Sequence, residues 1–133
     1  MLKWFRAKEA PLRGAPPVRR LKTYSGQSGY VYEYFYEGYR ASERNGGGGT
    51  QYVFRVSSGP GAELGHSIFL PDAALVPWER ANGRPLTSTE RYAVAKLALF
   101  QAFDDWPAPA EAVREIAVDA AAADGFLAAL DIG

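Results

Sequence analysis

The sequence predicts an α+β fold in which a three-stranded antiparallel meander packs on two or three helices. Three observations lead to this prediction. Two runs of alternating residues flank a glycine-rich loop, a short apolar run ends at a proline, and an alanine-rich run follows a helix-capping sequence. The chain has 133 residues, of which 47% are hydrophobic and 14% aromatic, which is enough for one domain with its own core.

The alternating runs predict a long β-hairpin. Residues 30–39 read Tyr-Val-Tyr-Glu-Tyr-Phe-Tyr-Glu-Gly-Tyr, and residues 50–57 alternate in the same way. The Asn-Gly-Gly-Gly-Gly segment between them is typical of a hairpin loop. It lacks the lysine and the following helix that a phosphate-binding loop requires. We expect opposed residues to have numbers that sum to 92, so that Tyr36 faces Val56 and Glu37 faces Arg55.

This register separates a core face from a charged face. The even-numbered residues form the predicted core face: Tyr32, Tyr34, Tyr36, Tyr52, Phe54 and Val56. The other face carries Val31, Glu33, Phe35, Glu37, Tyr39, Val53, Arg55 and Ser57. Charges that can pair across the strands mark this second face as the outer one. Gly38 within the strand indicates a bulge or a close backbone approach.

A third strand and two helices follow the hairpin. Residues 66–70 are predicted to form a short strand, which Pro71 ends. Asp72 is the expected N-cap of a helix that runs to Asn82, and Gly83 is expected to close it in a left-handed conformation.

The second helix is predicted over roughly Thr89–Asp104. Thr87 and Glu90 have the spacing of a capping box at its start. One face carries large residues, which we expect to pack on the tyrosines of the sheet. The opposite face carries Val94, Ala95, Ala98 and Ala102, which would let another helix or a second subunit approach closely.

The C-terminal segment is ambiguous. Residues 113–118 fit either a helix or a short strand, and we favour a helix that Gly125 interrupts.

Charge divides the chain into a basic arm and a single domain. Residues 1–22 form a proline-containing arm, in which seven cations against Glu9 alone give a net charge of +6. Residues 23–133 form the predicted α+β domain. Its last part, residues 104–133, has seven carboxylates against Arg114 alone and a net charge of −6. The two ends can therefore pair, within one chain or between two chains.

Composition argues against several classes of function. The chain has no cysteine and one histidine, His66, so we predict no metal and no cofactor. It has no apolar run of about 18 residues that could span a membrane. The start of the chain does not resemble a secretory signal, so we expect a cytoplasmic protein.

Lys96 is placed on the buried face of the second helix. A buried lysine can act as a nucleophile or base, and with His66 it could line a ligand pocket. Alternatively, its side chain reaches the surface or pairs with Glu33 or Glu37.

Three functions remain compatible with the sequence. The preferred one is a non-enzymatic interaction module that self-associates as a homodimer, with partner-binding residues Phe35, Tyr39, Val53 and Arg55. The first alternative is a nucleic-acid-binding accessory protein that uses Arg13, Arg19, Arg20 and Lys22. The second alternative is a small-molecule-binding domain or enzyme with a pocket near Lys96 and His66.

Overall fold

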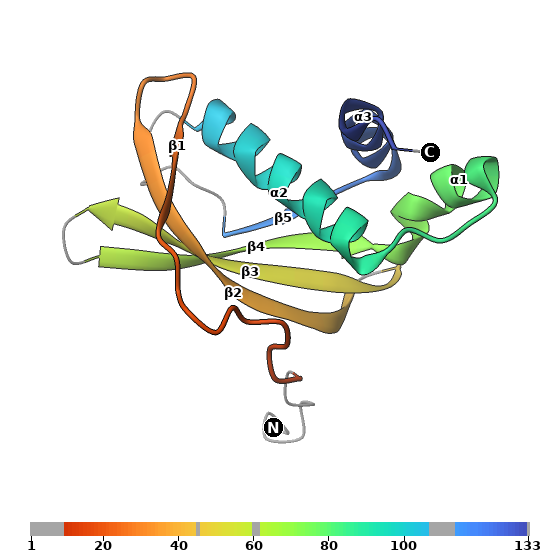
Figure 1. Cartoon of the computed structure of the whole chain (residues 1–133), viewed down its shortest axis with the longest axis horizontal. Helices are drawn as coiled ribbons and strands as arrows, with labels where there is room; N and C mark the ends of the chain where they lie inside the picture. Colours follow the sequence, from red (N-terminus) through yellow and green to blue (C-terminus); the bar gives the residue numbers. More distant parts are fainter. Residues whose placement is uncertain (1–9, 45, 60–61, 107–113, 133) are drawn as a thin grey trace.

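The chain folds as an α+β domain, which confirms the predicted class (Figure 1). The computed structural model describes residues 10–44, 46–59, 62–106 and 114–132. The strands are β1 (Lys22–Ser25), β2 (Val31–Arg44), β3 (Gly47–Gly59), β4 (Ala62–Pro71) and β5 (Glu115–Ala117). The helices are α1 (Asp72–Asn82), α2 (Ser88–Asp105) and α3 (Ala120–Leu130).

The strands form one mixed, curled sheet in the order β1-β2-β3-β4-β5, with the shape of a half-barrel. Strands β1 to β4 are antiparallel, and β5 runs parallel to β4. The prediction of a three-stranded sheet was therefore wrong: the sheet has five strands, with β1 and β5 on either side of the predicted three. The two extra strands have four and three residues, which is too short for a period-two pattern to show in the sequence.

The register of the central hairpin differs from the prediction by two residues. Tyr34 faces Val56 and Tyr36 faces Phe54, so these residue numbers sum to 90. The strands continue to Arg44 and from Gly47, so the connection is tighter than a loop of five residues. A shift of two residues keeps every side chain on its face, because side chains alternate with period two. The predicted core residues of this hairpin are accordingly buried or packed against the core.

A bulge between Tyr36 and Gly38 changes the faces beyond it. It brings Tyr39 opposite Tyr52, so placing Tyr39 on the outer face was wrong. Both explanations offered for Gly38 are confirmed. Its φ of 130° belongs to the bulge, and a Cβ atom there would lie 2.6 Å from the carbonyl oxygen of Arg13. Arg13 and Tyr39 exchange two backbone hydrogen bonds of 2.8 and 2.9 Å, which hold the arm against the sheet.

The ends of the first two helices largely follow the sequence signals. Gly83 closes α1 with a φ of 67°, as predicted. Pro71 is the N-cap residue of α1, however, and Asp72 lies in the first turn without capping it. The capping box of α2 is confirmed, because the Thr87 hydroxyl accepts from Glu90 N and the Glu90 carboxylate accepts from Thr87 N.

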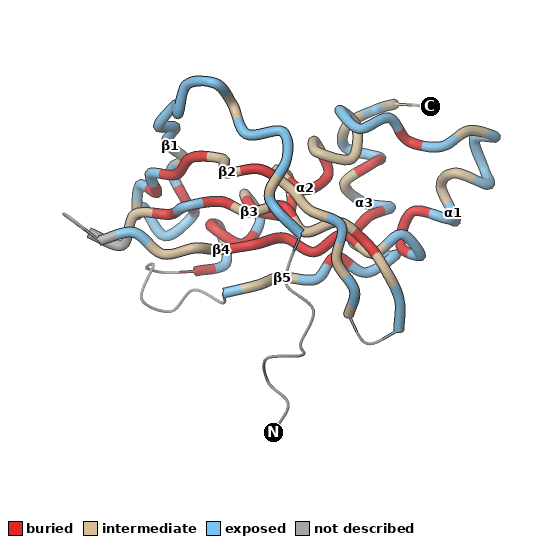
Figure 2. The backbone as a smooth tube through the Cα atoms, turned by 90° about the horizontal axis from the view of Figure 1, so that it is seen from below, coloured by how far each residue is buried: buried red, intermediate tan, exposed pale blue. Residues whose placement is uncertain are grey.

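Helix α2 lies across the concave face of the sheet and forms the centre of the core (Figure 1). Its large residues pack on tyrosines as expected: Phe103 stacks on Tyr32 with ring centroids 4.3 Å apart, and Tyr92 lies 4.8 Å from Tyr36. Its small residues Ala98 and Ala102 are buried next to β5 and α3. The buried positions run along the middle strands and α2 (Figure 2).

The prediction for the C-terminal segment was wrong in two respects. Glu115–Ala117 is a strand, and Gly125 lies inside α3 without interrupting it. The strand forms because the edge of β4 offers backbone partners: Ser67 N donates to Arg114 O and Val118 N donates to Phe69 O, both over 2.9 Å. None of the helices in the described part of the chain is long and apolar enough to cross a membrane.

Candidate functional site

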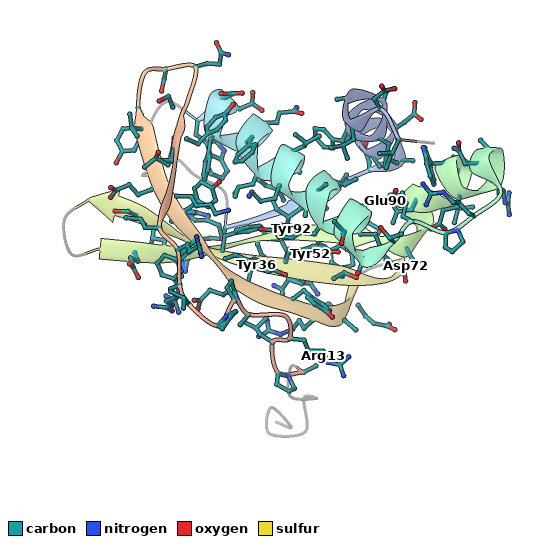
Figure 3. The ribbon with its side chains drawn as sticks, viewed as in Figure 1. Arg13, Tyr36, Tyr52, Asp72, Glu90 and Tyr92 are labelled. Carbon is teal, nitrogen blue, oxygen red and sulfur yellow. The ribbon has the colours of Figure 1, made fainter. Side chains whose placement is uncertain are left out.

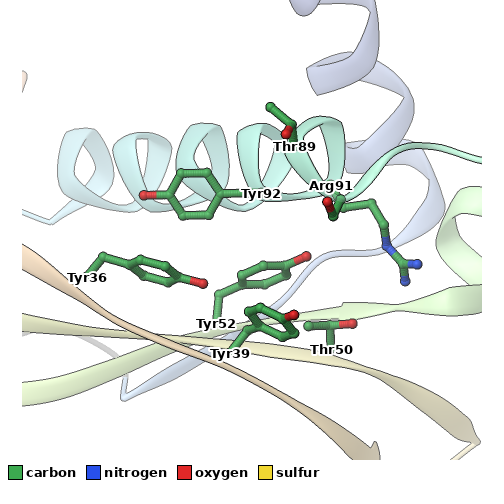
Figure 4. A pocket seen from close by; sticks show the side chains of 8 residues that line it. Tyr36, Tyr39, Thr50, Tyr52, Thr89, Arg91 and Tyr92 are labelled. Atoms are coloured by element: carbon green, nitrogen blue, oxygen red, sulfur yellow. The ribbon is translucent and has the colours of Figure 1, made fainter. Parts of the chain in front are cut away.

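A cavity of about 330 Å³ lies between the start of α2 and the sheet. Four tyrosines line it, and we call it the tyrosine pocket: Tyr36, Tyr39, Tyr52 and Tyr92. Three of the rings come from the sheet and face the fourth on the helix (Figure 4). Figure 3 shows Tyr36, Tyr52 and Tyr92 together between the helix and the sheet, with Arg13 away from them on the arm.

Each tyrosine reaches the tyrosine pocket for a different local reason. Alternation along β2 and β3 turns Tyr36 and Tyr52 toward α2. The bulge adds Tyr39, which would otherwise lie on the outer face. Tyr92 is in the second turn of α2, after the capping box that fixes where the helix begins.

Three phenols of the pocket, those of Tyr36, Tyr52 and Tyr92, stay protonated at neutral pH. Burial raises the pKa of Tyr36, and the neighbouring Tyr92 raises it further. Burial also raises the pKa of Tyr92 and of Tyr52, although the charge of Arg91 opposes the increase at Tyr52. A neutral phenol keeps its O–H, so these groups can donate hydrogen bonds to a ligand.

The other end of the tyrosine pocket is polar. Arg91, Thr50 and the first residues of α2, Ser88 and Thr89, line this end (Figure 4). Arg91 Nη2 donates to Asp72 Oδ1 over 2.8 Å. The Asp72 side chain is 66% exposed and is not part of the pocket lining. Arg91 Nε is buried without a hydrogen-bond partner among the described residues.

The electrostatics of the pocket favour an acceptor or an anion. Arg91 is the charged residue in the described lining. Guanidinium and phenol groups both donate hydrogen bonds. The arrangement can therefore hold the apolar body of a small molecule among the rings and a polar group at Arg91.

Lys96 and His66, which were expected to line a ligand pocket, are not part of the lining of the tyrosine pocket. The Lys96 ammonium lies 5.3–5.5 Å from the centroids of three rings, those of Tyr34, Tyr92 and Phe100. Burial lowers the pKa of Lys96, and the nearby Lys22 lowers it further. Neither Glu33 nor Glu37 pairs with it in the described part of the chain; the carboxylate of Glu37 binds Arg19 and Arg55 instead.

His66 is buried on β4, and its ring centroid lies 5.6 Å from that of Trp106. Lys96 and His66 therefore have different aromatic neighbours. Lys96 is connected to the tyrosine pocket through Tyr92, whereas His66 is not part of its lining.

The predicted partner-binding residues do not form one patch. Phe35, Val53 and Arg55 share the outer face, but Tyr39 faces the tyrosine pocket. Phe35 is buried, because the Arg19 guanidinium lies 4.2 Å from its ring centroid. The arm thus covers part of the apolar surface that self-association was expected to use.

The four cations proposed to bind nucleic acid lie along the arm and the first strand. Arg13 is fixed through its backbone, and Arg19 pairs with Glu37 over 2.6 Å. Arg20 is exposed, and Lys22 is the first residue of β1, opposite Tyr34. Their binding role remains a prediction.

The described residues contain no group of three or more potential metal ligands. Sequence reasoning missed Arg91 and Thr50, because their approach to the four tyrosines depends on how α2 crosses the sheet. The tyrosines on the predicted core face were a signal for this site. The sequence does not show, however, where packed side chains leave a cavity.

Comparisons with protein-family models, with curated proteins and with solved structures found no match for this chain. The geometry of the tyrosine pocket is therefore the basis for a functional proposal.

Proposed function

We propose that this protein binds a small molecule in the tyrosine pocket. The observation that carries the proposal is a cavity of about 330 Å³ lined by four tyrosines at one end and by Arg91 at the other. Ligand sites typically combine an apolar, often aromatic, lining with a few polar groups that orient the ligand, and they start at about 300 Å³. The tyrosine pocket has this composition and this size.

The exposure of the rings also supports binding. Tyr36, Tyr39 and Tyr92 are only partly buried, so apolar ring surface in the pocket is in contact with water. A ligand that covers these rings would remove this surface from water and stabilise the folded state.

A fragment screen by NMR and thermal shift tests this proposal. We expect binders to raise the melting temperature and to shift amide signals of Thr50, Tyr52, Arg91 and Tyr92. Thr89→Phe, which places a ring at the exposed edge of the pocket, should abolish these shifts. Ala81→Phe, on the exposed side of α1, is the matched control and should leave them unchanged. Binders that still shift these amide signals in the Thr89→Phe variant would contradict the proposal.

A further inference from the structure

The lining of the tyrosine pocket also limits the chemistry of its ligand. We propose that the pocket takes an aromatic monocarboxylate, with its ring among the tyrosines and its carboxylate at Arg91. This inference rests on the proposed function and specifies the class of ligand.

The tyrosine end suits one aromatic ring. Neighbouring rings in the pocket are tilted rather than parallel: Tyr39 and Tyr52 have centroids 6.1 Å apart, and Tyr52 and Tyr92 have centroids 6.2 Å apart. Tilted rings at about 4.5–7 Å are the favourable arrangement for aromatic pairs, so a further ring can join the cluster by its edge or its face. A cavity of about 150 Å³ already holds benzene. The 330 Å³ here leaves room for a ring and a carboxylate.

The polar end suits an anion. A carboxylate accepts hydrogen bonds only, and the groups that line this end can donate them: the Arg91 guanidinium and the hydroxyls of Thr50, Ser88 and Thr89. Hydrogen bonds between a guanidinium and a carboxylate are roughly twice as strong as those between neutral groups.

Asp72 does not prevent this interaction. It uses one nitrogen of Arg91, Nη2, and its own side chain is largely exposed. Exposed ion pairs contribute at most about 1 kcal/mol, so an incoming carboxylate can share or replace this one. A monocarboxylate that replaces Asp72 on Arg91 keeps one negative charge beside one guanidinium, whereas a phosphate would bring a charge of about −1.5 to −2 at neutral pH.

The test compares benzoate with benzamide and acetate by calorimetric or NMR titration of the full chain. Benzamide has the same ring without the charge, and acetate has the charge without the ring. We expect benzoate to bind at least about tenfold more tightly than benzamide, a difference of about 1.4 kcal/mol. Acetate should bind more weakly than either.

Two variants assign the preference to Arg91. Arg91→Gln should remove the preference for benzoate, because benzoate loses a charged partner while benzamide loses only a donor to its carbonyl oxygen. Asp72→Asn removes the competing carboxylate and should keep or increase the preference for benzoate. If Arg91→Gln does not fold, the three probes on the natural chain still show whether the pocket prefers an aromatic monocarboxylate.

The outcomes separate this inference from the proposed function. Equal affinity for benzoate and benzamide, or a preference that survives Arg91→Gln, would overturn the inference while leaving a pocket that binds aromatic molecules. Loss of the preference in Asp72→Asn would also overturn it. If none of the ring-containing probes shifts the signals of the pocket residues, the inference is overturned, and only the fragment screen decides the proposed function.

Discussion

Phe54 and Arg55 are neighbours on β3 that lie in opposite environments. Phe54 is fully buried under α2, with its ring 5.3 Å from Tyr36, whereas the Arg55 side chain is 44% exposed on the outer face. Alternation along a strand is the whole cause of this difference. Up to the bulge at Gly38 the sequence was an accurate guide at this scale, because side chains alternate regularly along an uninterrupted strand.

This contrast gives the first prediction. Phe54→Ala should lower the free energy of unfolding by about 3–5 kcal/mol, because it leaves a cavity in the core. Arg55→Ala should lower it by less than about 1 kcal/mol, because it removes one exposed ion pair with Glu37. Urea unfolding of the two variants measures both values. Similar losses would mean that the two faces of the hairpin are assigned incorrectly.

At the scale of the elements, local capping interactions and backbone conformation determine where α1 ends and where α2 begins. The capping box at Thr87 and Glu90 starts α2, and the left-handed Gly83 ends α1. The link between them is also held by Arg84, which donates to both carboxylate oxygens of Glu90 over 2.8 and 2.9 Å. One carboxylate thus caps a helix and anchors the loop before it.

This double role predicts a pH dependence. The Arg84 hydrogen bonds, and then the hydrogen bond from Thr87 N, lower the pKa of Glu90 from 4.5 to about 2. Because the folded state favours the charged form, the stabilisation is present above pH 4.5 and is lost as the pH falls toward 2. Glu90→Gln keeps the cap acceptor but lacks the charge.

The Glu90→Gln variant should therefore be less stable than the natural chain at neutral pH and should approach it at low pH. Urea unfolding from pH 4.5 down to about 2 measures this convergence. Arg84→Gln should remove most of the pH-dependent difference as well. A difference that is constant over this range would contradict the role of the ion pair.

Two glycines at helices give a matched pair of predictions. A Cβ atom would meet nothing within 4 Å at either Gly83 or Gly125, so only backbone conformation distinguishes them. Gly125→Ala should stabilise α3 by about 0.5–1 kcal/mol, because alanine has the higher helix propensity. Gly83→Ala should destabilise by roughly 1–2 kcal/mol, because alanine disfavours its φ of 67°. Effects of the same sign in urea unfolding would contradict this explanation.

At the scale of the whole molecule, distant parts of the chain are joined across the outer face. Arg44 at the end of β2 donates to both oxygens of Glu115 in β5, over 2.9 and 2.8 Å. Ser67 and Gln51 also donate to Glu115 Oε1. The arm is joined to the backbone of β2 through Arg13 and to the outer face through the ion pair of Arg19 with Glu37. These contacts tie both ends of the described chain to the central hairpin.

Self-association is the prediction that belongs to this scale. It now depends on Val53 and Arg55, because Arg19 covers Phe35 and Tyr39 faces the tyrosine pocket. Light scattering over a dilution series should give twice the monomer mass, and Arg55→Glu should shift the midpoint to higher concentration. A repeat at about 1 M salt, where screening acts within about 3 Å, separates the apolar and ionic parts. A monomer mass at every concentration would contradict self-association.

The sequence by itself determined the α+β class, the alternation of the central strands up to the bulge, the capping box and the end of α1. Each depends on residues within a few positions of one another, through side-chain alternation or through a cap. Only the tertiary structure decided β1 and β5, since three or four residues become a strand when a neighbouring edge supplies their hydrogen bonds. It also decided the register, because the pairing begins at Arg44 and Gly47 and shifts by one residue at the bulge before Gly38. The tyrosine pocket depends on both: alternation supplies Tyr36 and Tyr52, while the bulge and the path of α2 bring Tyr39, Tyr92 and Arg91 to the same cavity.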